Sequence, residues 1–124
     1  MANYANNGWA FFAPNVIVSE VLYVLCQKFQ DGMLTETEYD ESVEDFQDQL
    51  SGIRSLPNGD FSLIKRAKEI RQNYGCSRSS DSLYIALAEE LATSHNVELL
   101  TFDTGFINQA AKNAPAVKVN LLPV

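Results

Sequence analysis

Helical and strand-like hydrophobic patterns alternate along the chain, and this alternation constrains the fold more than any other feature. The connections between the patterned segments are short. Such alternation predicts an α/β fold, in which helices cover a mainly parallel sheet. Apolar residues recur at helical spacing in residues 16–30, 36–50, 61–74, 81–94 and 104–112. Short apolar runs typical of buried strands occupy residues 9–12, 53–56, 97–102 and 117–119.

Two polar residues mark predicted helix starts. Asn15 precedes the first helical pattern, and its side chain is suited to cap that helix. Thr35 is followed three positions later by Glu38, which is the spacing of a capping box. We therefore expect helices that begin near residues 16 and 36.

Length and composition predict a single soluble domain. The 124 residues are 46 % hydrophobic and 20 % charged, as in ordinary globular proteins. Residues 1–8 show no period and are expected to form a loose leader before one domain at 9–124. The longest apolar stretches are far shorter than the roughly 18–20 residues that cross a bilayer, and the first ten residues lack the basic start of a signal peptide. These features predict a cytoplasmic protein.

The acidic net charge of −7 is unusual for a protein that binds nucleic acid. Basic residues are nevertheless concentrated in residues 61–80, where five lie beside a single acid. One interpretation is a solvated helix face, and the other is a patch that contacts RNA. The candidates for RNA contact are Lys65, Lys68, Arg71 and Arg78.

Three carboxylates occupy unusual positions in the pattern. Glu20 lies among apolar residues of the first helix, Asp81 opens a helix that is apolar almost all round, and Asp103 follows the best strand. In proteins with an open parallel sheet, ligands bind beyond the carboxyl ends of the strands, which is where Asp103 is expected to lie. If the three acids converge, a divalent cation would offset their repulsion. Carboxylates without nitrogen or sulfur ligands favour Mg²⁺ or Mn²⁺, and such a site supports phosphodiester hydrolysis.

Each of these residues also has a simpler interpretation. Asp81 and Asp103 suit helix caps or first-turn acids, and Glu20 suits the solvent edge of its helix. Thr101 and Ser79 are candidates for hydroxyls that support the carboxylates, although hydroxyls are common at strand ends and caps. Two isolated cysteines and a single histidine do not make a zinc site with four ligands.

Three segments resemble motifs of the PIN domain family, and specifically of the VapC-like toxins of toxin–antitoxin systems. They are Ala13–Val21, Ser80–Ala88 and Leu100–Phe106, and their acids are separated by 61 and 22 residues. The resemblance runs from Trp9 to the C-terminus. It implies a three-layer sandwich with the activity of a Mg²⁺-dependent ribonuclease. Under this resemblance Glu20, Asp81 and Asp103 match metal-binding acids of the family, and Thr101 matches its small hydroxyl residue.

The resemblance also implies an RNA substrate, homodimers and an antitoxin partner. The family begins with a strand that ends in its first Asp, followed by a helix, and residues 1–8 show no equivalent. We therefore expect the N-terminal strand–helix unit to be missing and the nuclease to be impaired. The alternative is a catalytically inactive PIN-like module that acts by binding other proteins. A weaker alternative is a receiver-like domain in which Asp103 accepts a phosphoryl group. Such a domain needs a Lys near the end of its last strand, and in this chain Lys118 lies inside the predicted last strand.

Overall fold

The structure is a computed structural model that describes residues 8–73, 76, 80–101 and 104–122. The chain divides into two compact units, Met1–Pro57 and Asn58–Val124. In the described part of the chain, no helix has both the length and the apolar character needed to cross a membrane. The predicted leader falls on residues 1–8, of which only Gly8 lies inside the described residues.

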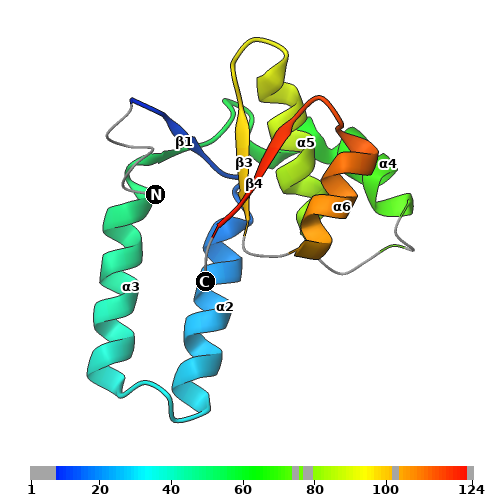
Figure 1. The fold of residues 1–124 in the computed structure, drawn as a ribbon. Coiled ribbons are helices and arrows are strands. Elements are labelled where there is room, and N and C mark those ends of the chain that lie inside the picture. Colours follow the sequence, from blue (N-terminus) through cyan, green and yellow to red (C-terminus); the bar gives the residue numbers. More distant parts are fainter. Residues whose placement is uncertain (1–7, 74–75, 77–79, 102–103, 123–124) are drawn as a thin grey trace. The chain divides into compact units, whose positions relative to one another are not determined.

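The first unit consists of a helical hairpin and a short pair of parallel strands. In chain order its elements are β1 (Phe11–Phe12), α2 (Ile17–Gln30), α3 (Glu36–Leu50) and β2 (Ile53–Arg54). Strands β1 and β2 pair in parallel, with Phe11 opposite Ile53. The helices α2 and α3 run side by side, joined by a short turn (Figure 1).

Helices α2 and α3 meet along half-buried stripes. On α2 the stripe repeats every four residues at Ile17, Val21, Leu25 and Phe29, and neither helix contains a fully buried residue. On α3 it follows the sequence prediction, at Tyr39, Val43, Phe46 and Leu50. The rings of Phe29 and Tyr39 stack with their centroids 5.0 Å apart, which ties the hairpin near its turn.

The two predicted helix starts have different outcomes. The capping box is confirmed: Glu38 N donates to Thr35 Oγ1 over 3.1 Å, and Thr35 N donates to the Glu38 carboxylate over 3.0 Å. The backbone hydrogen bond from Thr35 is the main reason that the pKa of Glu38 is lowered. The cap predicted at Asn15 is wrong, because the N-cap residue of α2 is Val16, without a side-chain cap.

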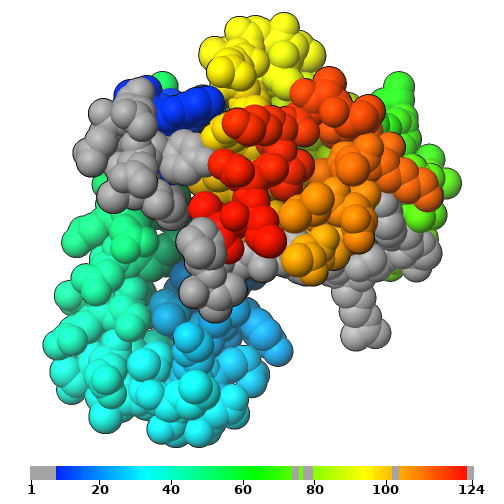
Figure 2. All heavy atoms as spheres, viewed as in Figure 1, coloured from blue at the N-terminus to red at the C-terminus, as the bar shows by residue number. Residues whose placement is uncertain are grey.

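The second unit contains the core. Its elements are η1 (Gly59–Leu63), α4 (Ile64–Gln72), α5 (Asp81–Ala92), β3 (Glu98–Thr101), α6 (Thr104–Asn113) and β4 (Lys118–Leu121). Strands β3 and β4 pair in parallel, and the ion pair Lys118–Glu98 joins their first residues at 2.6 Å. Helix α6 packs on both strands, and in Figure 2 the atoms of β4, in red, lie beside those of α6, in orange.

Helix α5 lies at the centre of this unit because it is apolar on nearly all sides. It contacts α4, α6, η1 and β3. Ile85 of α5 and Ile70 of α4 are fully buried, and Ala86, Leu87 and Ala88 are nearly so. Full burial of an Ile side chain contributes about 1.5–3 kcal/mol. The prediction that this helix is buried on more than one side is confirmed.

The α/β character and the parallel pairing of the strands are confirmed. The chain forms five α-helices within the described residues. Parallel strands need a long crossover connection, which usually contains a helix. Helices α2 and α3 lie between β1 and β2 in the chain, and α6 lies between β3 and β4. The three-layer sandwich, the single domain at 9–124 and the missing N-terminal unit stay predictions.

Candidate functional site

Asp81 is the first residue of α5, the best-buried helix of the second unit. Its side chain is half-buried, and its Oδ2 accepts a hydrogen bond of 3.2 Å from Gln109 Nε2 of α6. Gln109 is itself half-buried beside the apolar stripe formed by Phe106 and Ala110. The amide therefore fixes one oxygen of the Asp81 carboxylate from a neighbouring helix.

A chain of amides supports the residue that holds Asp81. The backbone carbonyl of Gln109 accepts a hydrogen bond of 2.9 Å from Asn113 Nδ2, and Asn113 Oδ1 accepts one of 2.8 Å from Asn73 Nδ2. Asn113 is buried, with 8 % of its surface exposed. These bonds tie the C-terminal end of α6 to the residue that follows α4. Satisfied buried amides of this kind restrict the geometry of their surroundings.

Arg66 of α4 joins the same framework. Its guanidinium donates two hydrogen bonds to the Glu89 carboxylate on α5, over 2.7 and 3.0 Å, and a third of 2.8 Å to the Asn113 carbonyl. It also pairs with Glu69 at 3.0 Å. The hydrogen bond that Arg66 donates to Glu89 is the largest reason that the pKa of Arg66 is raised. This cation of the basic segment therefore has a structural role.

The other predicted site residues lie in different places. Glu20 is half-buried on α2 of the first unit. Thr101 is half-buried at the carboxyl end of β3, where its backbone carbonyl accepts a hydrogen bond of 2.7 Å from Leu122 N. Asp103 and Ser79 lie outside the described residues. Within residues 8–73, 76, 80–101 and 104–122, no group of three or more His, Cys, Asp or Glu could hold a metal ion.

The basic candidates lie on α4, apart from Arg78, which is not among the described residues. Lys65 and Lys68 are exposed, and Arg71 is half-buried. Lys68 and Arg71 line a pocket of about 540 Å³ between α4 and α5, and Lys65 does not. The predicted RNA-contact residues thus divide into two that share a concave surface and one on the open helix face.

Sequence reasoning missed Gln109, Asn113 and Ser82. Gln109 and Asn113 are separated by one helical turn and adjoin the apolar stripe of α6, so they are polar residues where packing is expected. Ser82 stands between Asp81 and the apolar run that begins at Leu83, and it is buried. A polar residue beside a buried stripe is the signal that identifies all three, since buried polar groups need partners.

Comparison with known families identifies a match over most of the chain. The family described as PIN domain matches residues 7–112, a segment that includes positions 20, 81 and 103. No curated protein and no solved structure matches the chain.

Proposed function

Because the chain belongs to the PIN domain family, we propose that it is a divalent-metal-dependent endoribonuclease of the VapC-like type. PIN domains are generally nucleases, and they typically use divalent metal ions. The observation that carries the proposal for this chain is the Asp81 carboxylate, which Gln109 holds at the start of a buried helix. A carboxylate fixed by a rigid framework is suited to bind a ligand in one geometry.

The proposed ligands are Glu20, Asp81 and Asp103. All three are carboxylates, and this donor set fits a hard cation that prefers oxygen, so the ion is Mg²⁺ or Mn²⁺. When bound, such an ion supplies an activated water and neutralises charge at the phosphate. Gln109 donates to one oxygen of the Asp81 carboxylate and so helps to keep this carboxylate turned in one direction.

The remaining predicted residues orient the substrate and the acids. Thr101 lies two residues before Asp103, at the end of a strand. We assign the hydroxyl groups of Thr101 and Ser79 the role of positioning neighbouring carboxylates or water. Lys65, Lys68, Arg71 and Arg78 form the basic segment that attracts RNA phosphates in an otherwise acidic chain. Salt is therefore expected to weaken RNA binding.

A cleavage assay tests this function. The full chain, with Mg²⁺ and a fluorescently labelled single-stranded RNA, is expected to cut the RNA, and EDTA is expected to abolish the cutting. Asp81→Asn should lower the rate by a factor of about 100 or more, because it removes a charged ligand. Asp45→Asn, which changes an exposed acid of α3, is the control and should cut normally. Equal rates for both variants would contradict the proposal.

A homodimer and an antitoxin complete the proposal for the VapC-like type. Helix α2 and the turn after it expose large apolar side chains, with Tyr23 66 % and Met33 68 % exposed, and exposed apolar patches mark interaction sites. The same observation supports the second candidate function, an inactive PIN-like module that acts by binding. Light scattering alongside the cleavage assay separates the two, because the inactive module would form oligomers without cutting RNA.

A further inference from the structure

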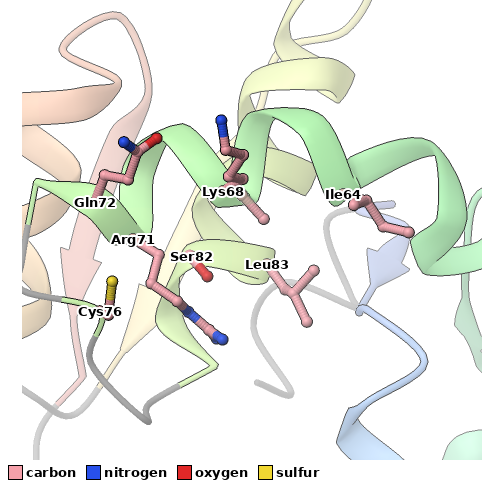
Figure 3. Close-up of a pocket in the computed structure, with 8 residues that line it drawn as sticks. Ile64, Lys68, Arg71, Gln72, Cys76, Ser82 and Leu83 are labelled. Atoms are coloured by element: carbon pink, nitrogen blue, oxygen red, sulfur yellow. The ribbon is translucent and has the colours of Figure 1, made fainter.

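Helices α4 and α5 border an open pocket that belongs entirely to the second unit. Its volume is about 540 Å³, which is enough space for a small ligand. Ile64 and Ala67 of α4 and Leu83 of α5 supply apolar wall. Figure 3 shows the side chain of Arg71 reaching from α4 toward Ser82 and Leu83 on α5.

A buried hydroxyl lines this pocket. Ser82 is only 4 % exposed, and its Oγ has no hydrogen-bond partner among the residues that the structure describes. A buried hydroxyl without a partner costs about 1–3 kcal/mol, so packing alone gives no reason for a serine here. The oxygen has almost no accessible surface, so a ligand in the pocket recovers this cost when the Ser82 side chain turns its hydroxyl toward the ligand.

Two cations adjoin the apolar wall and the hydroxyl. Lys68 is exposed and Arg71 is half-buried, and both line the pocket. Their charges stand out because the chain as a whole has a net charge of −7. These groups are complementary to a nucleotide. The apolar wall suits the face of the base, the hydroxyl can hydrogen-bond the polar edge of the base, and the cations suit the phosphate.

We propose that the pocket between α4 and α5 binds one unstacked nucleotide of a single-stranded RNA. The base lies against Ile64, Ala67 and Leu83, and Ser82 Oγ hydrogen-bonds the polar edge of the base. Arg71 and Lys68 bind the adjoining phosphates. The proposal rests on the proposed function only in its choice of RNA as the occupant. Under this proposal, Lys68 and Arg71 of the basic segment belong to a pocket that is selective for one base.

Binding to the metal-free chain tests the pocket separately from catalysis. The full chain in EDTA is titrated with the four nucleoside 5′-monophosphates and with inorganic phosphate, and amide resonances are followed by NMR. We expect at least one nucleotide to bind about tenfold more tightly than phosphate and to shift resonances of α4 and α5. Equal binding of phosphate and all nucleotides, or shifts confined to other elements, would overturn the proposal.

Two variants assign the roles within the pocket. Arg71→Gln should weaken binding of the preferred nucleotide about tenfold, and Ser82→Ala should reduce the preference among bases about fivefold. Ser82→Ala should leave the melting temperature unchanged or higher, since it removes a buried unpartnered group. Lys112→Gln changes an exposed cation of α6 outside the pocket and is the matched control. Unchanged base preference in Ser82→Ala would overturn the proposal.

An RNA strand identifies the occupant. A single-stranded oligoribonucleotide containing the preferred base should shift the same resonances and bind more tightly than the mononucleotide, because neighbouring phosphates add contacts. If only the free mononucleotide binds there, the occupant is a free nucleotide and the proposal is wrong. If the oligonucleotide binds in EDTA but is not cut with Mg²⁺, the pocket stands and the proposed nuclease function fails.

Discussion

The two units of this chain achieve order by different means. In the second unit, α4, α5 and α6 all contribute buried side chains, including the fully buried Ile70 and Ile85. In the first unit, α2 and α3 contribute none, and the buried residues described there are Ala13 and Pro14, which precede α2. Fully buried apolar side chains supply most of the stability of a domain. The second unit is therefore expected to be the more resistant to unfolding.

Hydrogen bonds join the helices of the second unit to one another. In the first unit the capping box joins residues three positions apart, and the bond from Ala13 N to Arg54 O joins the region of its strands. In the second, Arg66 bonds Glu89 across 23 positions and Asn73 bonds Asn113 across 40. Long-range bonds fix helices relative to one another, whereas local bonds fix only a helix end. Asp81 is therefore held by hydrogen bonds between helices, whereas α2, which carries Glu20, packs on α3 through half-buried apolar side chains.

The largest expected effect compares the same substitution in both units. Ile85→Ala removes a fully buried side chain and should lower the free energy of unfolding by about 2–5 kcal/mol. Ile17→Ala removes a half-buried side chain of α2 and should cost about 1 kcal/mol. Urea unfolding followed by circular dichroism measures both. If both variants lost the same free energy of unfolding, the claim that buried side chains stabilise the second unit more than the first would be contradicted.

The capping box should have the next largest effect. Thr35→Ala removes the hydroxyl that accepts from Glu38 N and should cost about 1 kcal/mol. Thr37→Ala, two positions further into α3, is the control with the same change of side chain. Thermal unfolding of the two variants measures the difference. Equal melting temperatures for the two variants would show that the capping box does not stabilise α3.

The bridge between α4 and α5 should contribute a smaller amount. Arg66 and Glu89 are 35 % and 37 % exposed in their side chains, so water screens their attraction. A double-mutant cycle with Arg66→Met and Glu89→Gln should give a coupling free energy of about 0.5–1 kcal/mol. The same cycle with Arg66 and Glu69, which lie on one helix, should give less. A coupling near zero for Arg66 and Glu89 would show that this ion pair does not stabilise the contact between α4 and α5.

The smallest expected effect is a pH dependence of the first unit. The pKa of Glu38 is lowered in the folded chain, chiefly by the backbone of Thr35. Its contribution is therefore fully present above the ordinary glutamate value and is lost as the pH falls through the lowered one. Glu38→Gln should remove part of the loss of stability between neutral pH and about pH 3.5, measured by urea unfolding. An unchanged pH profile would show that the capping carboxylate has no such role.

The sequence predicts helices and strands well where a pattern extends over many residues. The buried helix at Leu83–Ala88 and the capping box at Thr35 were identifiable because periodicity and spacing are local signals. Asn15 failed as a cap because the Ile17 amide bonds the Pro14 carbonyl over 3.1 Å, and the helix then begins after Val16. A competing backbone partner of this kind leaves no trace in the residue pattern.

The candidate site is less accessible from the sequence because its supports are tertiary. Asp81 was identifiable from its position at the start of an apolar helix, but its partner Gln109 lies 28 positions away. Nothing in the spacing of the two residues indicates their contact. Ser82 does adjoin the apolar run at Leu83–Ala88, but a serine beside an aspartate at a helix start also has the pattern of an ordinary cap, and that interpretation conceals its burial. Convergence of Glu20, Asp81 and Asp103 on one ion stays a prediction.

Calorimetric titration with Mn²⁺ tests the central claim most directly. The wild-type chain is predicted to bind a single Mn²⁺ ion, and Glu20→Gln, Asp81→Asn and Asp103→Asn are each predicted to weaken binding by about tenfold or more. Gln109→Leu should weaken it less, because that residue only orients a ligand. Asp45→Asn should bind as the wild type does. Negligible heat in the wild type, or equal heat in every variant, would contradict the account.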